Sequence, residues 1–545
     1  MYCRKIALIA SLLCVLCLPH LQGIGFAATV TVNENTVYQA IDGFGGYGGL
    51  TYRVPPYNDA WVRLIVDSLG ITMLRLMMPT GYEGVNDNAD PSVFDTTKIL
   101  WNRGADGGTL TDMLSYIEAV SDYAKSKNQP LKLIVTSWSP EAWMKSNNSI
   151  NGGTLNGNMY DEYAEWVVQF LKLVKSRCGT EIFGYCIQNE PELAMWYISC
   201  TMSASVYRDV SKVLGARIRQ EGLNTKLYGS DCVGTTCITS GWAATLGGDS
   251  TCAGYYHAFS VHGYENNGTT GNPGSAQAWQ AAGAAATRYG KHLWMTETAG
   301  YGGASATQWQ QAWNAAQGFF NALGAGNANG WTWWQLASSQ AKYDNGEALM
   351  VWENPGTITT ISPRFYVHEH FCKYVWPGSV RVSAVSNDTA NTKALAFVDQ
   401  QRGLLTIQLL SFNGTQGLSV SVGGNSVPTQ YRVYQTTSTL NCRDQGVMAA
   451  NGTIDLPAQS ITSLVGGFPV SVAPGRQARQ GAPAYAVPAK QRRVYAIDGR
   501  LVSATRKMGA DGSLRMSSKG VYIAVDAAAA RKTSRVIAAG SAAQP

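Results

Sequence analysis

The chain of 545 residues is long enough for more than one domain. Its composition, 45% hydrophobic and 14% charged, is that of a globular protein and excludes a disordered or fibrous chain. The net charge of +6 comes from the end of the chain, because residues 476–545 carry 13 Lys and Arg against three Asp and Glu. A near-neutral body with a basic tail does not indicate a nucleic-acid enzyme, so we expect no nucleic-acid partner. The tail could bind an acidic polysaccharide or an envelope surface, or only keep itself in solution.

Residues 1–28 have the features of a secretory signal peptide. Arg4 and Lys5 precede an apolar stretch over residues 6–18, and small residues at its far end offer a cleavage site. The apolar stretch is too short to span a bilayer. We therefore expect an exported protein, either extracellular or on the outer cell surface.

Three of the 11 cysteines fall in the signal peptide, and the other eight fit disulfide bonds in an exported chain. Cys178 and Cys186 are one candidate local pair, and two of Cys232, Cys237 and Cys252 are another. A zinc site is the alternative, but these eight include no Cys-x-x-Cys pair and have no histidine at ligand spacing. We therefore expect no metal site.

Helix and strand signals alternate between about residues 41 and 375. Helical patterns such as residues 159–175, with apolar residues at three-to-four spacing, separate short β-rich runs. Strands are expected at residues 41–44, 72–78, 131–137, 182–188, 226–229, 258–262, 292–296 and 330–334. Eight strands interleaved with helices predict an α/β fold, a closed (β/α)8 TIM barrel over residues 43–375.

The rest of the chain predicts β structure of another kind. From about residue 379 apolar residues recur with period two between Gly, Asn and Asp turns, which predicts a side antiparallel β-sandwich over residues 376–466. Strands within residues 29–42 have no place in the barrel and should join this domain. Residues 467–490, rich in Pro, Ala and Gly, are typical of a linker. The basic residues 491–545 contain two strand-like runs and predict a small C-terminal β module.

Two glutamates stand at the ends of buried strands, 107 residues apart. Glu190 lies in Gln188-Asn189-Glu190-Pro191, and Glu297 lies in Thr296-Glu297-Thr298. Three βα units of roughly 36 residues separate strands four and seven of such a barrel, which matches this spacing. Carboxylates at two strand ends suit the hydrolysis of a glycosidic bond, because one acid protonates the leaving oxygen while the other attacks or activates water.

Each glutamate has neighbours that suit a role. Glu190 is the candidate acid/base, and Asn189 beside it can hydrogen-bond a sugar 2-hydroxyl. Glu297 is the candidate nucleophile. Arg75 lies within an apolar strand, where a buried arginine needs a carboxylate partner, either Glu297 or an unrelated aspartate. Tyr264, after strand six, can also hydrogen-bond the nucleophile.

Aromatic residues at strand ends are candidates for stacking on a sugar, and packing against helices is the alternative for each of them. The candidates are Trp138, Trp143, Trp331, Trp333 and Trp334. Because successive residues of a strand face opposite ways, one of the last two should face the barrel mouth, and we assign Trp333 and Trp138 to the substrate. His262 is also assigned to the substrate site, although a histidine of the core or barrel wall is expected there more than a catalytic one.

Several motifs in this order resemble those of glycoside hydrolase family 30. They are Ile41-Asp42-Gly43-Phe44-Gly45-Gly46, Thr136-Ser137-Trp138-Ser139-Pro140 with Trp143-Met144-Lys145, Gln188-Asn189-Glu190-Pro191, Ser260-Val261-His262-Gly263-Tyr264, Thr296-Glu297-Thr298 and Trp331-Thr332-Trp333-Trp334. The resemblance covers about residues 30–466 and implies a (β/α)8 barrel with a side β-sandwich, retaining chemistry and no cofactor. By this match Glu190 corresponds to the acid/base and Glu297 to the nucleophile, with carboxyl groups about 5 Å apart.

The resemblance leaves the substrate open, because the family includes xylanases, β-1,6-glucanases, β-1,6-galactanases and glucosylceramidases. Its glucuronoxylanase branch recognises a glucuronyl group through an arginine in the loop after strand eight, whereas residues 335–363 contain Lys342 and no arginine. Our leading hypothesis is a monomeric, secreted endo-β-1,4-xylanase that does not depend on that group. The alternatives are a β-1,6-glucanase or glucosylceramidase-like β-glucosidase, and a non-catalytic carbohydrate-binding protein. The C-terminal module resembles sorting domains of exported polysaccharidases, which implies contact with the cell surface or the secretion machinery.

Overall fold

The computed structural model describes residues 28–48, 59–105, 108–264, 274–302, 305–353 and 357–469, and four short strands after them. The predicted signal peptide and linker lie almost wholly outside the described residues. The chain divides into two units, residues 1–470 and residues 471–545. No helix among the described residues is both long and apolar enough to cross a membrane.

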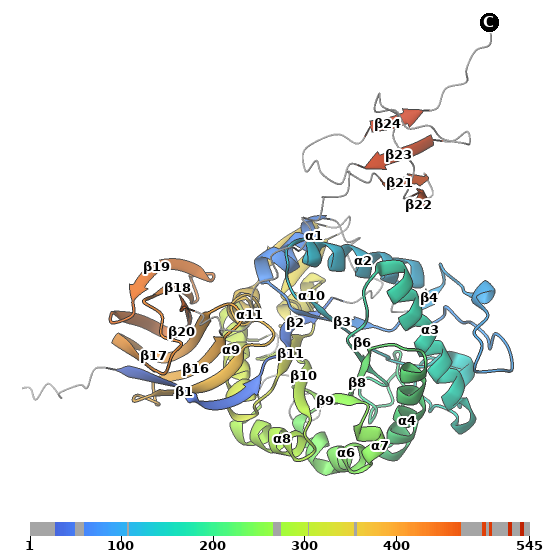
Figure 1. The fold of residues 1–545 in the computed structure, drawn as a ribbon, viewed down its shortest axis with the longest axis horizontal. Coiled ribbons are helices and arrows are strands. Elements are labelled where there is room, and N and C mark those ends of the chain that lie inside the picture. The colour runs from blue at the N-terminus through green and yellow to red at the C-terminus, as the bar shows by residue number, and fades with distance from the viewer. Residues whose placement is uncertain are drawn as a thin grey trace, which may run out of the picture. The chain divides into compact units, whose positions relative to one another are not determined.

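Eight parallel strands close into a barrel, which confirms the predicted fold class (Figure 1). In order around the barrel they are β2 (Gly43–Tyr47), β3 (Met73–Met77), β6 (Lys132–Thr136), β7 (Gly184–Cys186), β8 (Lys226–Cys232), β9 (Tyr256–His262), β10 (His292–Glu297) and β11 (Gly330–Trp333). β11 pairs in parallel with β2 and so closes the ring. Glu190 follows the fourth strand and Glu297 ends the seventh.

Helices surround the barrel and cover its outer face with apolar side chains. They are α1 (Asp59–Arg63), α2 (Leu110–Ser126), α3 (Tyr160–Cys178), α4 (Ala204–Gln220), α5 (Thr235–Cys237), α6 (Ala243–Gly248), α7 (Ser250–Ala253), α8 (Ala276–Arg288), α9 (Gln308–Phe320), α10 (Gln340–Asp344) and α11 (Pro363–Cys372). Hydroxyl side chains start four of the long helices, since Thr109, Ser203, Ser275 and Thr307 each accept a hydrogen bond from a first-turn amide. A three-stranded sheet of β12 (Ala337–Ser338), β13 (Met350–Glu353) and β14 (Thr357–Ile361) lies between β11 and α11.

The side β domain is one seven-stranded sheet that folds back on itself. Its order is β1 (Thr29–Ala40), β15 (Val380–Ser386), β16 (Thr392–Asp399), β17 (Leu404–Gly423), β20 (Thr453–Gly467), β18 (Gln430–Thr436) and β19 (Arg443–Ala449). β1 pairs antiparallel with β15 and also parallel with β17, so the sheet encloses its own apolar core. His370 of α11 joins this domain to the barrel, because its Nδ1 lies 2.6 Å from Ser463 Oγ and its Nε2 lies 2.8 Å from Thr436 Oγ1.

The C-terminal unit contains a small antiparallel sheet. Its strands, in the order β22 (Leu501–Ser503), β21 (Arg493–Ala496), β23 (Val521–Val525) and β24 (Arg535–Ala538), include the two strand-like runs of the sequence and two further strands.

A polar cluster around Asp42 ties together strands at the start of the barrel. Asp42 Oδ2 lies 2.5 Å from His292 Nδ1 and 3.0 Å from His257 Nε2, and it accepts from Trp294 Nε1 at 2.8 Å. Asp42 Oδ1 pairs with Lys132 Nζ at 2.8 Å. Burial opposes ionisation, but the two histidines and the lysine hold the pKa of Asp42 well below its usual range. Because the protein's own donors already surround this carboxylate, the cluster serves the fold.

One disulfide is present among the described residues, Cys232–Cys237, with Cα atoms 6.0 Å apart. It is one of the pairs that the sequence allowed. The predicted Cys178–Cys186 pair is wrong, because both thiols are free and lie on opposite sides of the barrel wall. Cys178 ends α3 and donates to Leu114 O, whereas Cys186 lies among the side chains of the barrel interior.

Candidate active site

A fully buried arginine, Arg75 of β3, connects several strand ends at the mouth of the barrel. Its guanidinium donates to Glu297 Oε2 at 2.6 Å, to Asn189 Oδ1 at 2.8 Å and to Asp231 Oδ2 at 3.0 Å. Its Nε donates to Thr136 Oγ1 at 3.2 Å. The sequence allowed either Glu297 or an unrelated aspartate as the partner of Arg75, and the structure shows both, Glu297 and Asp231.

Glu297 is held at both carboxylate oxygens. Arg75 contacts Oε2, and the hydroxyl of Tyr264 donates to Oε1 at 3.2 Å. The residue is only 7% exposed. Burial raises the pKa of Glu297, and the interactions with His262 and Arg75 oppose that rise.

Glu190 follows β7 in a left-handed backbone conformation, with φ of 44°. Asp231, at the end of β8, shares that conformation with φ of 53°, and its carbonyl accepts from the Glu190 amide at 3.0 Å. A residue other than glycine pays a conformational cost there, so the two turns are held by their surroundings. The Glu190 carboxyl reaches His262, whose Nδ1 lies 3.0 Å from Glu190 Oε1.

His262 is fully buried between the two glutamates, and burial lowers its pKa. Its Nε2 lies 3.5 Å from a guanidinium nitrogen of Arg75, which has only donors to offer. Nε2 is therefore the unprotonated acceptor, and Nδ1 carries the hydrogen that it donates to Glu190. This assignment of the tautomer follows from the hydrogen-bond network.

The two carboxyl groups are close neighbours with different surroundings. One oxygen of Glu190, one oxygen of Glu297 and a nitrogen of His262 lie within 4.8 Å of one another. Retaining glycosidases have carboxyl groups about 5–5.5 Å apart, whereas inverting enzymes need about 6.5–9.5 Å. Burial, with a smaller contribution from Asp231, raises the pKa of Glu190 to about 7 against the opposing charge of Arg75. Glu297 contacts the guanidinium directly and Glu190 does not, so the positive charge of Arg75 favours the ionised form of Glu297 more strongly than that of Glu190.

An aromatic floor adjoins the carboxyl groups. Trp138 is 5% exposed, and Arg75 Cζ lies 4.7 Å from the centre of its ring. The ring of Tyr47 lies 5.7 Å from Trp138 and 4.3 Å from Trp334. Tyr197, on the loop after β7, packs against the same group. Of the other predicted aromatics, Trp143 turns away and donates to the carbonyl of Glu83 at 2.9 Å, and Trp331 is fully buried.

The assignment of Trp333 to the substrate is wrong. Trp333 is fully buried, and its ring packs edge-on against Tyr301 and His368 on the helix side of the barrel wall. Its indole N–H donates to Glu347 O at 2.8 Å. The strand ends at Trp333, so Trp334 turns to the other side and lies with the aromatic floor.

Asp231 belongs to the site but was not found from the sequence. Besides Arg75, its carboxylate accepts from Ser260 Oγ and Thr296 Oγ1, each at 2.5 Å. Burial alone would raise its pKa, but Arg75 and His262, with these hydroxyls, hold the pKa of Asp231 below its usual range. The signal that was available is its place after the apolar run of β8, the same context that identified both glutamates.

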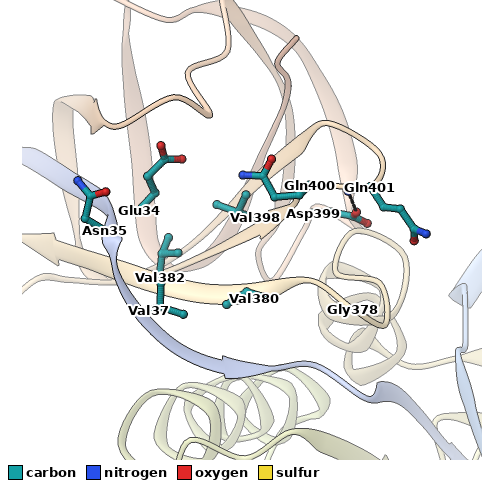
Figure 2. A pocket seen from close by; sticks show the side chains of 10 residues that line it. All are labelled: Glu34, Asn35, Val37, Gly378, Val380, Val382, Val398, Asp399, Gln400 and Gln401. Carbon is teal, nitrogen blue, oxygen red and sulfur yellow. Dashed lines mark hydrogen bonds between the residues drawn. The ribbon is translucent and has the colours of Figure 1, made fainter. Parts of the chain in front are cut away.

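A separate hollow of about 700 Å³ lies on the side β domain, as Figure 2 shows. It is lined by Glu34, Asn35, Val37, Gly378, Val380, Val382, Val398, Asp399, Gln400 and Gln401. None of these side chains is aromatic, and the carboxylate of Asp399 is already paired with Arg402 at 2.7 Å. The hollow therefore has neither a stacking surface nor a free acid pair, and the catalytic candidates remain at the barrel mouth.

Comparison with known proteins agrees with this geometry. Residues 112–341 match the model of the glycosyl hydrolase family 30 TIM-barrel domain. Over these residues, which include most of the barrel, the chain is similar to glycoside hydrolase family 30. The chain is thus a glycoside hydrolase of the retaining type, and the non-catalytic alternative is set aside.

Relatives in this family have several activities. Glucuronoxylanase XynC of Bacillus subtilis is 24% identical over 458 residues, which cover 81% of this chain and 92% of that protein. An endo-1,6-β-D-glucanase of Neurospora crassa is 24% identical over 217 residues, 38% of this chain and 42% of its own. Among solved structures, a family 30 subfamily 8 xylanase from Clostridium acetobutylicum aligns with a TM-score of 0.63 at 21% identity, covering 81% of this chain and 99% of its own.

Asp231→Ala should lower the free energy of unfolding by about 3–5 kcal/mol, because it leaves the buried Arg75 with one carboxylate in place of two. Denaturation in urea, followed by tryptophan fluorescence, measures the change. As a control, Asp209→Ala removes an acid whose side chain is 42% exposed, and should change stability by less than about 0.5 kcal/mol. A cost below about 1 kcal/mol for Asp231→Ala would show that solvent replaces the lost carboxylate.

Proposed function

We propose that this enzyme is a secreted, endo-acting glycosidase of β-linked plant cell-wall polysaccharide, most specifically an endo-β-1,4-xylanase, with Glu190 as acid/base and Glu297 as nucleophile. The observation that supports these two roles is that the two glutamates have different hydrogen-bond partners. The carboxyl groups approach within 4.8 Å, yet Glu297 contacts the Arg75 cation and Glu190 contacts a neutral imidazole.

In the first step Glu297 attacks the anomeric carbon while Glu190 protonates the departing oxygen. Arg75 fixes Glu297 Oε2, which leaves Oε1, held by the longer contact from Tyr264, to form the new bond. His262 occupies Glu190 Oε1, so the other oxygen carries the proton. The C–O bond electrons leave with the departing sugar, which takes the proton of Glu190.

In the second step water releases the sugar from Glu297. Forming the ester removes the negative charge of Glu297, which lowers the pKa of the neighbouring Glu190. Glu190, now a carboxylate, takes a proton from the attacking water, and Glu297 leaves as a carboxylate. Two inversions at the anomeric carbon give net retention. Asn189 shares its amide oxygen with Arg75, so its Nδ2 is the group available to a sugar 2-hydroxyl.

Xylan is the preferred substrate, with no requirement for a glucuronyl group. XynC and the Clostridium xylanase are similar over about four-fifths of this chain. The loop between Trp334 and Pro363 contains no arginine, and its Lys342 is paired with Glu347 at 2.9 Å. The next arginine, Arg364, is fully buried and donates to backbone carbonyls, so it is not available for a carboxylate on the substrate.

A β-1,6-glucanase is the second candidate. Endo-1,6-β-D-glucanases occur among the relatives, and the fold of the endo-β1,6-glucanase BT3312 aligns with a TM-score of 0.61 at 20% identity, covering 81% of this chain and 94% of its own. The mechanism of Glu190 and Glu297 is the same for either linkage, so the choice depends on the shape of the cleft around them.

An exposed tryptophan supports endo action. Trp196, on the loop after β7, is 85% exposed and lies edge-on to Tyr197, with ring centres 5.5 Å apart. Tyr197 in turn packs on the aromatic floor of Trp138 and Trp334. An indole exposed beside such a floor provides a flat surface on which a sugar remote from the reacting bond can stack.

Export and tethering complete the proposal. Residues 1–28 serve as the secretion signal, and the Cys232–Cys237 disulfide is suited to an oxidising compartment. The basic C-terminal module would contact the cell surface or the secretion machinery, and the catalytic unit would act as a monomer. The proposed chemistry uses side chains alone and needs no cofactor or nucleic acid.

The pH profile tests the assignment of Glu190. Only its protonated form donates to the leaving oxygen, so kcat/KM on xylan should fall about tenfold per unit of pH above about 7. Below the pKa of Glu297 the nucleophile is protonated, which gives an acid limb. Glu190→Gln should lose roughly 10²–10⁴-fold in kcat/KM and lose the alkaline limb as well.

Two further variants separate the roles in that experiment. Azide should restore turnover of an activated aryl glycoside by Glu190→Ala, because it can attack the glycosyl-enzyme without a general base. Glu297→Ala should stay folded by circular dichroism and be nearly inactive on every substrate. An alkaline limb that persists unchanged in Glu190→Gln would assign the acid to another group.

Product analysis on a polysaccharide panel tests the substrate. Glucuronoxylan and arabinoxylan should both release xylo-oligosaccharides, while β-1,6-glucan, β-1,6-galactan and mixed-linkage glucan should not be cleaved. Products from β-1,6-glucan alone would establish the second candidate. Cleavage of glucuronoxylan without arabinoxylan would show that a glucuronyl group is recognised by a residue other than an arginine of the β11–α11 loop.

Trp196→Ala tests endo action on a long chain. Losing one stacking contact should lower kcat/KM on polymeric xylan by roughly tenfold, and leave kcat/KM on an aryl xyloside within about twofold. Tyr38→Ala, which removes a 42% exposed aromatic ring from the side β domain, is the matched control and should change neither value. Equal losses on polymer and aryl xyloside would place Trp196 at the reacting bond.

A further inference from the structure

Four carboxylates meet outside the active site, between the loop after β3 and helix α3. Glu83 and Asp87 come from the loop, and Glu162 and Glu165, three residues apart, share one face of the helix. Their exposed fractions are 2%, 2%, 8% and 2%. One oxygen each of Glu83, Asp87 and Glu165 lies within 4.8 Å of the other two. We call these four residues the loop acid cluster.

The loop acid cluster has no cationic side chain in contact with it. Among the described residues, no Lys, Arg or His nitrogen lies within 4.0 Å of any of the four carboxylates. The cations nearby have other partners. Lys98 donates to the backbone carbonyl of Asp87, and Arg217 donates to the carbonyls of Pro91 and Ser92 and pairs with Glu221.

Several carboxylate oxygens in the cluster are buried without a partner. Neither oxygen of Glu83 has a hydrogen bond of acceptable geometry, although the Asp87 amide interacts with it weakly. Glu165 Oε1 and Glu162 Oε2 are also unpartnered. A buried carboxylate without donors or a counter-charge is costly, so such a group must take up a proton or a cation.

We propose that Glu83, Asp87 and Glu165 bind a divalent metal ion, and that this ion is Ca²⁺. Every side-chain ligand on offer is a carboxylate oxygen, which suits a hard cation and not zinc. Oxygens bound to one Ca²⁺ at about 2.3–2.6 Å lie at most about 5 Å apart, and those bound to Mg²⁺ at most about 4 Å. Separations of no more than 4.8 Å are compatible with one Ca²⁺, whose flexible coordination also suits carboxylates from a helix and an irregular loop.

Neighbouring side chains hold the ligands in place. Asn88 Nδ2 donates to Asp87 Oδ1 at 3.0 Å, and the Asp95 amide donates to Asp87 Oδ2. Asn86 Nδ2 donates to Glu162 Oε1 at 3.2 Å, which leaves Glu162 Oε2 facing no donor. Donors that orient a carboxylate while leaving lone pairs for an ion are the usual outer support of a metal site.

The ion would brace the rim of the active-site cleft. Residues 78–109 form a long connection whose only described regular elements are η2 (Thr96–Lys98), β4 (Gly104–Ala105) and β5 (Gly108–Thr109). The connection starts directly after β3, which carries Arg75. It also joins the loop after β6, because the Gly81 amide donates to both oxygens of Glu141, at 2.7 and 2.9 Å. A cation between the connection and α3 would therefore hold two loops of the catalytic face together.

The test uses the full chain after treatment with a chelator, titrated with CaCl₂. One Ca²⁺ per chain should bind by calorimetry, and a roughly 100-fold excess over Kd should raise the melting temperature by at least about 3 °C. Tb³⁺ should bind at the same place with luminescence excited through tryptophan, since Trp143 donates to the Glu83 carbonyl. Ca²⁺ should displace Tb³⁺, and Mg²⁺ should do so at least about tenfold less well.

Variants locate the site. Glu83→Gln and Glu165→Gln should each weaken Ca²⁺ binding at least about tenfold, because each removes a charged ligand. Asp455→Asn removes an exposed acid of β20 and should bind Ca²⁺ as the original chain does. Absence of binding to the original chain, or Ca²⁺ binding unchanged in both glutamine variants, would overturn the proposal. The measurements on the original chain decide the question even if a variant fails to fold.

Discussion

Arg75 is completely buried, and a guanidinium in that position must keep its donors hydrogen-bonded to acceptors. The strands that meet at the barrel mouth supply those acceptors. Glu297 comes from the seventh strand, Asp231 from the fifth, and Asn189 from the turn after the fourth. The positions of the two glutamates follow from this constraint, because one contacts Arg75 directly and the other follows Asn189 in the chain.

The same cation makes two chemically identical acids unequal. Arg75 favours the charged form of Glu297, and it also fixes the tautomer of His262 by occupying the side of Nε2. The imidazole can then only donate to Glu190. Burial raises the pKa of Glu190 to about 7, so this carboxyl group keeps its proton below that pH. With Asp231 ionised, the site carries one net negative charge, which is the complement that an oxocarbenium-like transition state requires.

The net charge of the site does not change through the proposed cycle. In the resting state Glu297 and Asp231 are negative, Arg75 is positive, and Glu190 is neutral. In the glycosyl-enzyme Glu297 is an ester and Glu190 has become the second negative group. Because the charge moves by less than 5 Å between two neighbouring carboxyls, the fixed dipoles around them need not reorganise between the steps.

Much of this arrangement could be predicted from the sequence, since the barrel imposes a regular repeat. The alternation of strands and helices and the 107-residue spacing placed Glu190 and Glu297 at strands four and seven, and the apolar setting of Arg75 required an acid partner. It was harder to predict whether a side chain at a strand end faces the barrel interior or the helices. Trp333 and Trp334 are equally apolar, and only the pairing of β11 with its neighbours decides that Thr332 faces inward and Trp333 outward.

Other features depended on contacts that no local pattern reveals. Cys178 and Cys186 are close in the chain, yet Cys178 lies at the end of α3, outside the barrel, and Cys186 lies in the barrel interior. Asp231 had the same local setting as the two glutamates, but the motifs drew attention only to them. The acids of the loop acid cluster lie 75 or more residues apart across the two elements, so their convergence follows from the packing of a loop on α3 and not from any spacing.

Both the barrel mouth and the loop acid cluster contain buried carboxylates that need a positive charge nearby. The two places differ in the geometry that is available to supply it. In the mouth, the strands are rigid and a long side chain from β3 reaches Glu297 and Asp231 with fixed geometry. Along the loop, the neighbouring Lys98 and Arg217 already bind backbone carbonyls and serve to shape the loop itself. A small ion with flexible coordination can satisfy carboxylates from a helix and an irregular loop together, where one guanidinium plane cannot. The stability of the cleft rim would then depend on the Ca²⁺ concentration around the protein, whereas the charge balance of the catalytic pair would be built into the chain.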